Sequence, residues 1–141
     1  MIIDIIGDIH GYADKLAGLL TQLGYVHNGE YYVPPANHRA LFIGDLIDRG
    51  SQQLRTLEIV FAMLDADVAD AVMGNHEYNA LAYATLDPYD EAQYLRSHTE
   101  LHTRQHEAFL AEAPFDSASH HYWLERLYEI PLWLETDYAC F

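Results

Sequence analysis

The sequence predicts an α/β fold built on a parallel sheet. Three short apolar runs, each of a length typical of a buried strand, alternate with segments whose apolar residues recur at helical spacing. Each run ends in a polar loop that contains glycine. Because functional groups in open parallel sheets gather beyond the carboxyl ends of the strands, we expect the three loops to meet at one edge. The predicted strands are residues 2–6, 40–43 and 69–73, each buried on both faces.

Between these strands, apolar residues lie three and four positions apart, which predicts helices. The first helix covers residues 13–23, and Gly24 is expected to cap its C-terminus. The second helix begins after Ser51, its expected N-cap, and its apolar positions extend to Leu64. Between the helices, the Asn-Gly pair at residues 28–29 predicts the turn of a small hairpin. This alternation of strands and helices favours right-handed crossovers within one sheet.

Residues 78–129 differ in character, and we expect them to form a helical insertion after the third polar loop. Asp87-Pro88 is expected to break the first helix of this region. A second helix is expected from about residue 90 to residue 112, and Pro114 ends it.

The remaining residues, 131–141, predict a strand, a turn near Asp137 and the start of another strand. The chain is expected to stop inside this last apolar run. We therefore expect residues 1–141 to form a single domain that is truncated at its C-terminal end.

The composition excludes several classes of protein. At 141 residues, half of them hydrophobic, the chain can build one ordinary core. A formal net charge of −15 with only seven Lys and Arg argues against nucleic acid as a partner, because phosphate contacts need those residues. No apolar run approaches the length of a membrane span, Cys140 has no second cysteine to pair with, and no basic leader begins the chain. We therefore expect a cytoplasmic protein without a membrane partner, whose oligomeric state stays open.

The three polar loops carry groups that bind metals or transfer protons. Asp8 and His10 lie two residues apart in an extended segment, so their side chains point to the same side and can share one ion. Asp45 adds a carboxylate that can bridge two ions, and Asn75 offers a neutral oxygen to the second ion. Mixed nitrogen and oxygen ligands suit Mn, Fe, Ni or Zn, and a pair of such ions is a known device for hydrolysing phosphate esters.

These loops resemble the signature of the calcineurin-like metallophosphoesterases, in the phosphoprotein phosphatase branch and of bacterial type. That branch carries GDxHG, GDxxDRG and GNHE, and every specified position is present in residues 7–11, 44–50 and 74–77. The resemblance implies a four-layer α/β/β/α sandwich, of which this chain would form the N-terminal part. It also implies a hydrolase with two divalent metal ions, for which manganese is the expected metal and Fe, Zn or Ni are alternatives.

The resemblance further implies which residues bind metal. Asp8, His10 and Asp45 would hold the first ion, and Asp45 and Asn75 would contribute to the second. Family members carry two more metal-binding histidines after later strands, and nothing after Glu77 clearly supplies them. The second ion is therefore expected to lack part of its ligand set in this chain.

The catalytic roles implied by the resemblance also make independent physical sense. His76 would be the general acid, and Asp48 would orient it, because a histidine held by a carboxylate is a common proton donor near pH 7. Arg49 would bind the substrate phosphate with its planar, permanently charged guanidinium group. Asn75 and His76 would contact the substrate as well.

Histidines within the chain offer an alternative source of metal ligands. His98, His102 and His106 recur every fourth residue, so on one helix they would line one face. No carboxylate or cysteine completes a ligand set with them, so we interpret this face as solvated.

A few further residues carry specific interpretations. Glu77 is either a partner that supports the metal ligands or a helix first-turn acid favoured by the dipole. Cys140 and Trp133 are expected to pack in the core. The tyrosines that follow the third loop either have structural roles or line a substrate cleft; they are Tyr78, Tyr83, Tyr89 and Tyr94.

The leading functional hypothesis is hydrolysis of phosphomonoesters, including phosphoprotein, by a hydroxide that two metal ions activate. The alternative enzyme within the same branch is a symmetrical dinucleoside tetraphosphatase. A third hypothesis is an inactive, truncated half domain that binds metal without turnover. The expected substrate is a phosphorylated small molecule, a nucleotide or a phosphoprotein.

Overall fold

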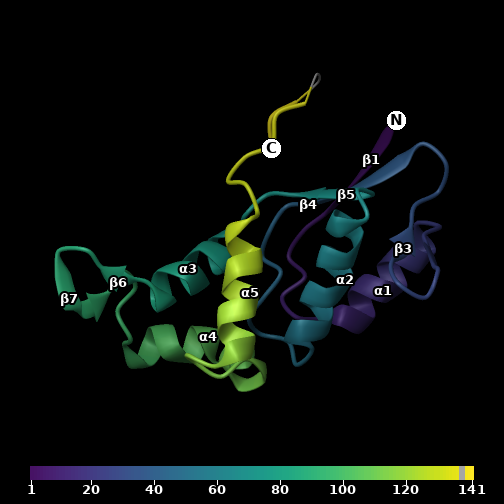
Figure 1. Ribbon diagram of the computed structural model, residues 1–141. Helices are drawn as coiled ribbons and strands as arrows, with labels where there is room; N and C mark the ends of the chain where they lie inside the picture. The colour runs from purple at the N-terminus through teal and green to yellow at the C-terminus, as the bar shows by residue number, and fades with distance from the viewer. Residues whose placement is uncertain (137–138) are drawn as a thin grey trace.

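A three-stranded parallel sheet forms the centre of the computed structural model, which describes residues 1–136 and 139–141 (Figure 1). Strand β4 (His38–Phe42) lies in the middle, between β1 (Ile2–Ile6) and β5 (Ala69–Ala71). The register places Ile6 opposite Phe42 and Phe42 opposite Ala71, so the carboxyl ends of the three strands lie at the same edge. The predicted α/β class and the parallel sheet are confirmed.

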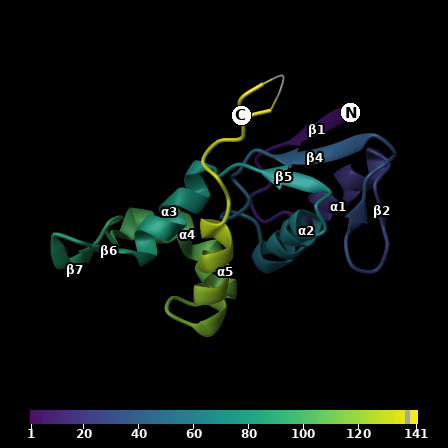
Figure 2. The same cartoon turned by 45° about the horizontal axis from the view of Figure 1, so that its top comes forward.

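Two helices connect these strands and pack against each other beneath the sheet (Figures 1 and 2). Helix α1 (Ala13–Gln22) links β1 to β4, and α2 (Gln53–Asp65) links β4 to β5. Each helix buries part of its apolar face against the sheet and the other helix, whereas Leu19 of α1 is 40% exposed. The buried residues of these faces include Leu16 and Leu20 on α1 and Leu57, Val60 and Met63 on α2.

The ends of α1 and α2 differ in how well the sequence predicts them. Gly24 follows α1 with φ of +89°, and its N–H donates to the carbonyl of Thr21 at 3.0 Å, as expected of a C-terminal cap. The N-cap prediction for Ser51 is wrong, because α2 begins at Gln53 and no side chain of its own segment caps it. Instead, the carboxylate of Glu112 accepts hydrogen bonds from the N–H groups of Gln53 and Leu54 at 2.8 and 3.0 Å.

The small hairpin predicted between α1 and β4 is confirmed. Strands β2 (Val26–His27) and β3 (Tyr32–Val33) pair antiparallel. The side chain of Asn28 closes the turn, since its Oδ1 accepts hydrogen bonds from the N–H groups of Glu30 and Tyr31, both at 2.9 Å.

Burial of the sheet on both faces holds for β4 but not for β1. The side chains of Leu41 and Phe42 point to opposite faces, and both are buried. In β1, by contrast, Ile2 and Ile5 are 54% and 55% exposed. The prediction for this strand is wrong because β1 is an edge strand, and among the described residues it pairs on one side alone, with β4.

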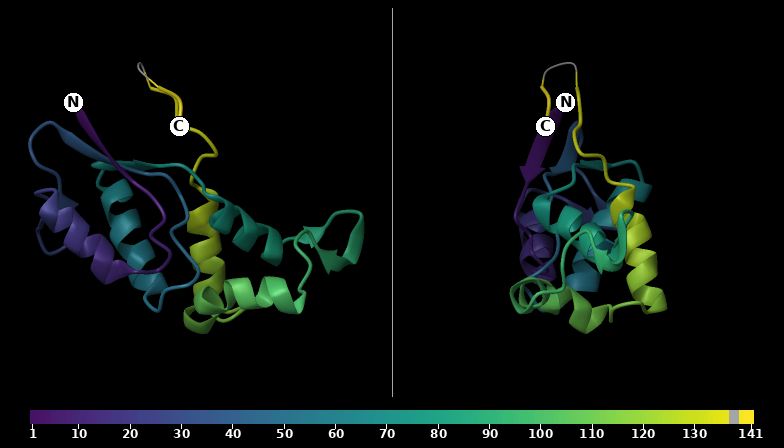
Figure 3. Two further views of the ribbon diagram at one scale, coloured as in Figure 1. Left: turned by 180° about the vertical axis from the view of Figure 1, so that it is seen from behind. Right: turned by 90° about the vertical axis from the view of Figure 1, so that its left-hand side faces the viewer.

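The region after the third loop contains a hairpin as well as helices. Helix α3 (Asn75–Ala84) leads into two antiparallel strands, β6 (Leu86–Asp87) and β7 (Asp90–Tyr94), which project from one end of the molecule (Figure 3). The helix predicted from about residue 90 is therefore wrong in its first part. The turn forms because Oδ1 of Asp87 accepts a hydrogen bond from the N–H of Tyr89 at 2.8 Å.

Two more helices complete this region and join its packing to that of the sheet. Helix α4 (Glu100–Glu112) contacts α2, and it ends before Pro114 as predicted. Helix α5 (Ala118–Tyr128) contacts α3. Buried side chains of both helices belong to the same apolar cluster as the strands; they include Phe109, Trp123 and Leu127.

The C-terminal residues show part of the predicted strand pairing. Glu135 forms an antiparallel bridge with Cys140, and Leu134 and Phe141 exchange two backbone hydrogen bonds. The turn predicted near Asp137 lies outside the described residues. The prediction of core positions for Cys140 and Trp133 is wrong, because both are exposed. None of the helices in the described ranges is long and apolar enough to span a membrane.

Candidate metal and phosphate site

The first two polar loops are joined by backbone hydrogen bonds beyond the carboxyl ends of β1 and β4. The N–H of His10 donates to the carbonyl of Asp45, and the N–H of Gly50 donates to the carbonyl of His10, both at 2.8 Å. The third loop lies equally close, since a Cβ on Gly44 would collide with the backbone of Gly74. The expectation that the loops meet at one edge of the sheet is therefore confirmed.

The backbone of these loops adopts a conformation that residues other than glycine rarely adopt. The non-glycine residues here with positive φ include Asp8 at 53°, His10 at 48°, Asp45 at 53°, Asp48 at 68° and Arg49 at 77°. Each left-handed residue costs about 1–2 kcal/mol, so the hydrogen bonds between the loops must hold it in place. Backbone strain of this kind is common at functional sites, where it aims side chains at one point.

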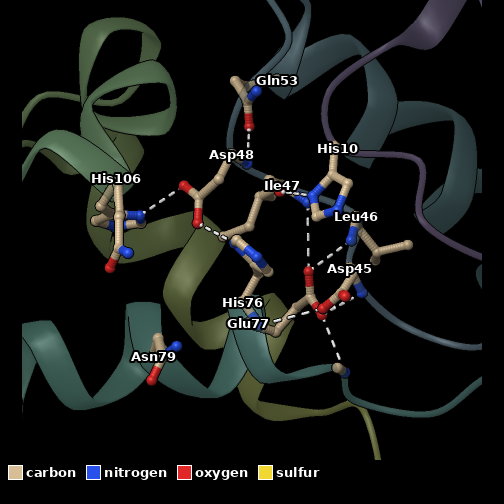
Figure 4. A network of polar contacts seen from close by, with 12 residues as sticks. His10, Asp45, Leu46, Ile47, Asp48, Gln53, His76, Glu77, Asn79 and His106 are labelled. Carbon is tan, nitrogen blue, oxygen red and sulfur yellow. Dashed lines mark hydrogen bonds and ion pairs between the residues drawn. The ribbon is translucent and has the colours of Figure 1, made fainter. Parts of the chain in front are cut away.

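Three side chains bring their donor atoms together at this edge of the sheet. Donor atoms of His10, Asp45 and His76 all lie within 4.8 Å of one another (Figure 4). Nδ1 of His10 is 2.9 Å from the carbonyl oxygen of Ile47, and because a carbonyl only accepts, this nitrogen donates and Nε2 is left to bind a metal. The set of two imidazoles and a carboxylate suits the borderline divalent cations Mn, Fe, Zn and Ni.

The cluster of histidine and carboxylate donors does not include Asp8, and Asn75 lines the cavity beside His76. Asp8 is exposed, and it lines a separate cavity of about 370 Å³ together with His10, Lys15 and Arg49. Asn75 is also exposed, at the first position of α3. Of the four predicted ligands, the structure thus brings His10 and Asp45 together and adds the imidazole of His76 to them.

Asp48 is buried and holds two histidines at once. Its Oδ2 lies 2.7 Å from Nδ1 of His76, and its Oδ1 lies 2.8 Å from Nδ1 of His106. An ionised carboxylate only accepts hydrogen bonds, so both imidazoles donate through Nδ1. Nε2 of His76 therefore remains free to bind a metal or to carry a transferable proton.

The solvated interpretation of His106 is wrong. This side chain is buried against the rings of Tyr83 and Phe109, and its Nε2 has no hydrogen-bond partner among the described residues. The sequence contains a signal for this placement, because His106 lies three and seven positions before the buried Phe109 and Ala113, on the same helical face. His98 precedes α4 and stacks on Tyr83, so the histidines do not share one helical face.

The side chain of Glu77 binds the backbone of the second loop. Its fully buried carboxylate accepts hydrogen bonds from the N–H groups of Asp45, Leu46 and Gly74 at 2.8, 2.7 and 3.0 Å. Glu77 thus holds the backbone of the loop that carries Asp45, and it is also the acid in the first turn of α3, so both interpretations apply. Burial raises the pKa of the Glu77 carboxyl above its ordinary value, although the backbone donors act in the opposite direction.

Gln53 has a comparable role that sequence reasoning missed. Its Oε1 accepts a hydrogen bond from the N–H of Asp48, and its Nε2 donates to the carbonyl of Gly50, both at 2.7 Å. Because this side chain is fully buried, it fixes the backbone that carries Asp48 and Arg49.

A cavity of about 470 Å³ opens beside His76. Its walls come from the second and third loops, from α3 and from the segment that includes α4, and they carry the guanidinium groups of Arg49, Arg96 and Arg104. Tyr83 lines this cavity, whereas Tyr78 and Tyr89 are exposed outside its lining. Tyr94 stacks on His98 and is also outside the lining, so the prediction of a tyrosine-lined cleft holds for Tyr83 alone of the four tyrosines.

Two kinds of sequence comparison relate this chain to known proteins. The model of the calcineurin-like phosphoesterase family matches residues 1–132. The bis(5'-nucleosyl)-tetraphosphatase PrpE [asymmetrical] of Geobacillus thermodenitrificans is 43% identical over 76 residues, which are 54% of this chain and 31% of that protein. The protein of the same name from Oceanobacillus iheyensis is 37% identical over 76 residues and 30% of its length. The match thus spans about a third of the length of these curated relatives.

Two solved structures have a fold similar to that of this chain. A protein serine/threonine phosphatase from Saccharomyces cerevisiae superposes with a TM-score of 0.56 and 20% identity, over 93% of this chain and 33% of that one. A putative diadenosine tetraphosphatase superposes with a TM-score of 0.53 and 18% identity, over 92% of this chain and 42% of that one. At such identities the likeness concerns the fold alone. With the family model matched over residues 1–132, the chain belongs to the calcineurin-like phosphoesterase family.

Proposed function

We propose that this chain carries metal-binding and proton-transfer groups of a metal-dependent phosphoesterase. The observation that carries the proposal is the convergence of donor atoms from His10, Asp45 and His76 within 4.8 Å, next to the His76–Asp48 pair. An arginine-lined cavity adjoins this cluster. Metal ligands, a histidine held by a carboxylate and a cationic cavity are the parts that hydrolysis of a phosphate ester requires.

The imidazole of His10 and the carboxylate of Asp45 suit divalent cations, and Mn is the metal that we propose. When bound, such ions supply Lewis-acid stabilisation of the phosphoryl oxygens and lower the pKa of bound water. Asp8 shares a cavity with His10, and Asn75 adjoins His76 in the chain, so both remain proposed additional ligands.

The chain's own residues can bind the substrate and move the proton. Arg49 lines the cavity and, among the described residues, has no carboxylate partner, so its guanidinium can grip two oxygens of the scissile phosphate. Water adds to phosphorus as the bond to the leaving oxygen breaks, and that oxygen takes a proton from Nε2 of His76. The attacking water loses a proton to solvent, and the imidazole regains one from solvent before the next turnover. Asp48 holds the other nitrogen of this imidazole and stabilises its charged form.

His76 can bind a metal or act as the acid, because both roles use the same Nε2. We assign it to the acid role, since its Nδ1 is tied to a buried carboxylate and its ring lines the cavity. The variant His76→Asn separates the two roles. As an acid, His76 is required for turnover but not for metal content, whereas a ligand is required for both.

The substrate class is a phosphomonoester, with phosphoprotein included. A dinucleoside tetraphosphate is the second candidate, because the curated relatives are named tetraphosphatases. Their names carry the word asymmetrical, whereas the sequence-based alternative was the symmetrical enzyme, so the cleavage position is a separate question. A location in the cytoplasm and the status of residues 78–129 as an insertion remain predictions.

Turnover of p-nitrophenyl phosphate with added Mn²⁺ tests the proposal. Replacing Asp45 by Asn removes a metal-binding carboxylate, so we expect kcat/KM to fall by about a hundredfold or more. The matched control is Asp14→Asn, an exposed carboxylate on α1 that pairs with Arg55, and it should leave kcat/KM within about twofold. If the wild-type chain binds metal but turns over neither p-nitrophenyl phosphate nor a dinucleoside tetraphosphate, the inactive half-domain hypothesis replaces the enzyme.

A further inference from the structure

Positive charge is scarce in this chain and is concentrated at one cavity. Seven Lys and Arg stand against 22 Asp and Glu. Three of the seven, Arg49, Arg96 and Arg104, line the cavity of about 470 Å³ beside His76. Only Arg49 belongs to a signature loop, so the other two extend the cationic surface away from the proposed scissile phosphate.

The remaining basic residues are engaged elsewhere. Arg39 binds Asp67 and Asp70, Arg55 binds Asp14, and Arg126 binds Asp65 and Glu129. Lys15 lies over the ring of Tyr12, 4.5 Å from its centroid. In the described part of the chain, arginines outside the cavity thus have carboxylate partners, whereas the cavity arginines have none.

Arg96 is oriented by neutral groups that leave its charge unbalanced. Its Nη1 donates to Oδ1 of Asn79 at 3.0 Å, and its Nη2 donates to Oε1 of Gln105 at 2.9 Å. Its backbone N–H also donates to the carbonyl of Ala82 at 2.9 Å, which fixes the residue against α3. Because both side-chain partners are amides, the guanidinium is preorganised without being neutralised.

Arg104 lies beside Gln105 on α4, and its side chain has no hydrogen-bond or ion-pair partner among residues 1–136 and 139–141. Two carboxylates also line this cavity. Asp48 is buried between His76 and His106, so Glu107 is the exposed acid. One exposed carboxylate does not balance three guanidinium groups, so the cavity favours an anion with more than one charged group.

We propose that Arg96 and Arg104 form a second anion subsite that binds a further phosphate group of the substrate. The inference rests on the proposed function, because it takes the scissile phosphate to lie at Arg49 and His76. A cavity of about 470 Å³ is within the usual range for small-molecule sites and has room for more than one phosphate group. The second phosphate belongs either to a polyphosphate chain or to a bisphosphate whose phosphates are separated by carbon atoms.

Comparing a substrate that has one phosphate with substrates that have several tests this subsite. Kinetics with Mn²⁺ are compared for p-nitrophenyl phosphate, which has one phosphate, inorganic tripolyphosphate, and fructose 1,6-bisphosphate. We expect Arg104→Gln and Arg96→Gln to lower kcat/KM for a multiply phosphorylated substrate, relative to that for p-nitrophenyl phosphate, by about tenfold or more. Loss with tripolyphosphate identifies a polyphosphate chain, and loss with the bisphosphate alone identifies separated phosphates.

Control variants separate binding from structural effects. Arg55→Gln removes an arginine outside the cavity and should leave the ratio unchanged. Arg104→Gln breaks no hydrogen bond or ion pair of the described residues, so it tests the subsite even if Arg96→Gln disturbs the packing of α3. Arg96→Lys keeps the positive charge but loses the planar guanidinium group with its two donor nitrogens. Its ratio of kcat/KM values should therefore lie between those of Arg96→Gln and the wild type. An unchanged ratio for both multiply phosphorylated substrates overturns the subsite.

Calorimetric titration with tripolyphosphate separates failure of the subsite from failure of the proposed function. The wild-type chain should bind this anion about tenfold more tightly than Arg104→Gln does. If the wild type turns over none of the substrates yet shows this difference in Kd, the proposed function fails and the subsite stands. If Arg104→Gln and the wild type have equal affinities for tripolyphosphate, and also equal affinities for fructose 1,6-bisphosphate in the same titration, the subsite is refuted whatever the turnover.

Discussion

Replacing Glu77 by Gln should destabilise the fold strongly, although the two side chains have nearly the same shape. The carboxylate is fully buried, and its Oε2 accepts hydrogen bonds from the N–H groups of Asp45 and Gly74. Its Oε1 accepts from Leu46 at 2.7 Å and from Ile47 at 3.3 Å. A glutamine has one acceptor oxygen, so in either orientation its NH₂ group faces two N–H donors.

The magnitude follows from these four contacts. Each buried donor without an acceptor costs about 1–3 kcal/mol, so two of them predict a loss of about 2–6 kcal/mol in the free energy of unfolding. For a chain of 141 residues this corresponds to a fall in Tm of about 6–18 °C. Differential scanning calorimetry or urea unfolding at pH 8 measures the loss.

The matched control is Glu58→Gln, because Glu58 is an exposed acid on α2. A surface change of this kind should alter the free energy of unfolding by no more than about 0.5 kcal/mol. Coincident unfolding curves for the two variants would refute the conclusion that Glu77 holds the second loop through its carboxylate.

Three more predictions concern backbone, titration and catalysis. Gly44→Ala should lower the free energy of unfolding by about 2 kcal/mol or more, because φ is +79° and the new Cβ meets the backbone of Gly74. Gly18→Ala, in the open interior of α1, should instead raise the free energy of unfolding by about 0.5–1 kcal/mol, and urea unfolding measures both changes. Burial lowers the pKa of His120 below 6.5, so the stability that is present above pH 6.5 should be lost as the pH falls toward the folded-state pKa. Between pH 7 and pH 5, the urea midpoint of His120→Gln should therefore fall less than that of the wild type. Asp48→Asn should lower kcat with p-nitrophenyl phosphate by about a hundredfold or more, and an unchanged kcat would contradict the role of this carboxylate.

Local sequence patterns predicted the sheet, the first two helices and the meeting of the three loops. These features follow from periodicity and from turn residues that act within a few positions. The alternation of apolar runs and helical segments sets the order of β1, β4 and β5, and Gly24 and Asn28 mark the ends of α1 and β2 through contacts with near neighbours.

Long-range contacts explain what the sequence did not predict. Glu112 caps α2 from 58 and 59 positions away, and His106 reaches Asp48 across 58 positions. The residues around Ser51 do not indicate Glu112 as the cap of α2, and the spacing of the histidines does not indicate Asp48 as the partner of His106. The hairpin of β6 and β7 was missed for a different reason, because the apolar residues of this region are too sparse for a clear helical or strand period.

The placement of the candidate ligands shows the same division. The motifs brought His10 and Asp45 together as predicted, but the backbone at Asp8, with φ of 53°, is not the extended conformation from which a shared side with His10 was inferred. The inference failed at the step from spacing to direction, because positive φ changes the direction of a side chain.

The most direct test of the central claim is the number of Mn²⁺ ions that each chain binds, measured by equilibrium dialysis and elemental analysis. The claim is that His10 and Asp45 form a metal site, so the wild-type chain and Asp14→Asn should bind at least one ion, and Asp45→Asn should lose it. Equal Mn²⁺ content in Asp45→Asn and Asp14→Asn would contradict the claim.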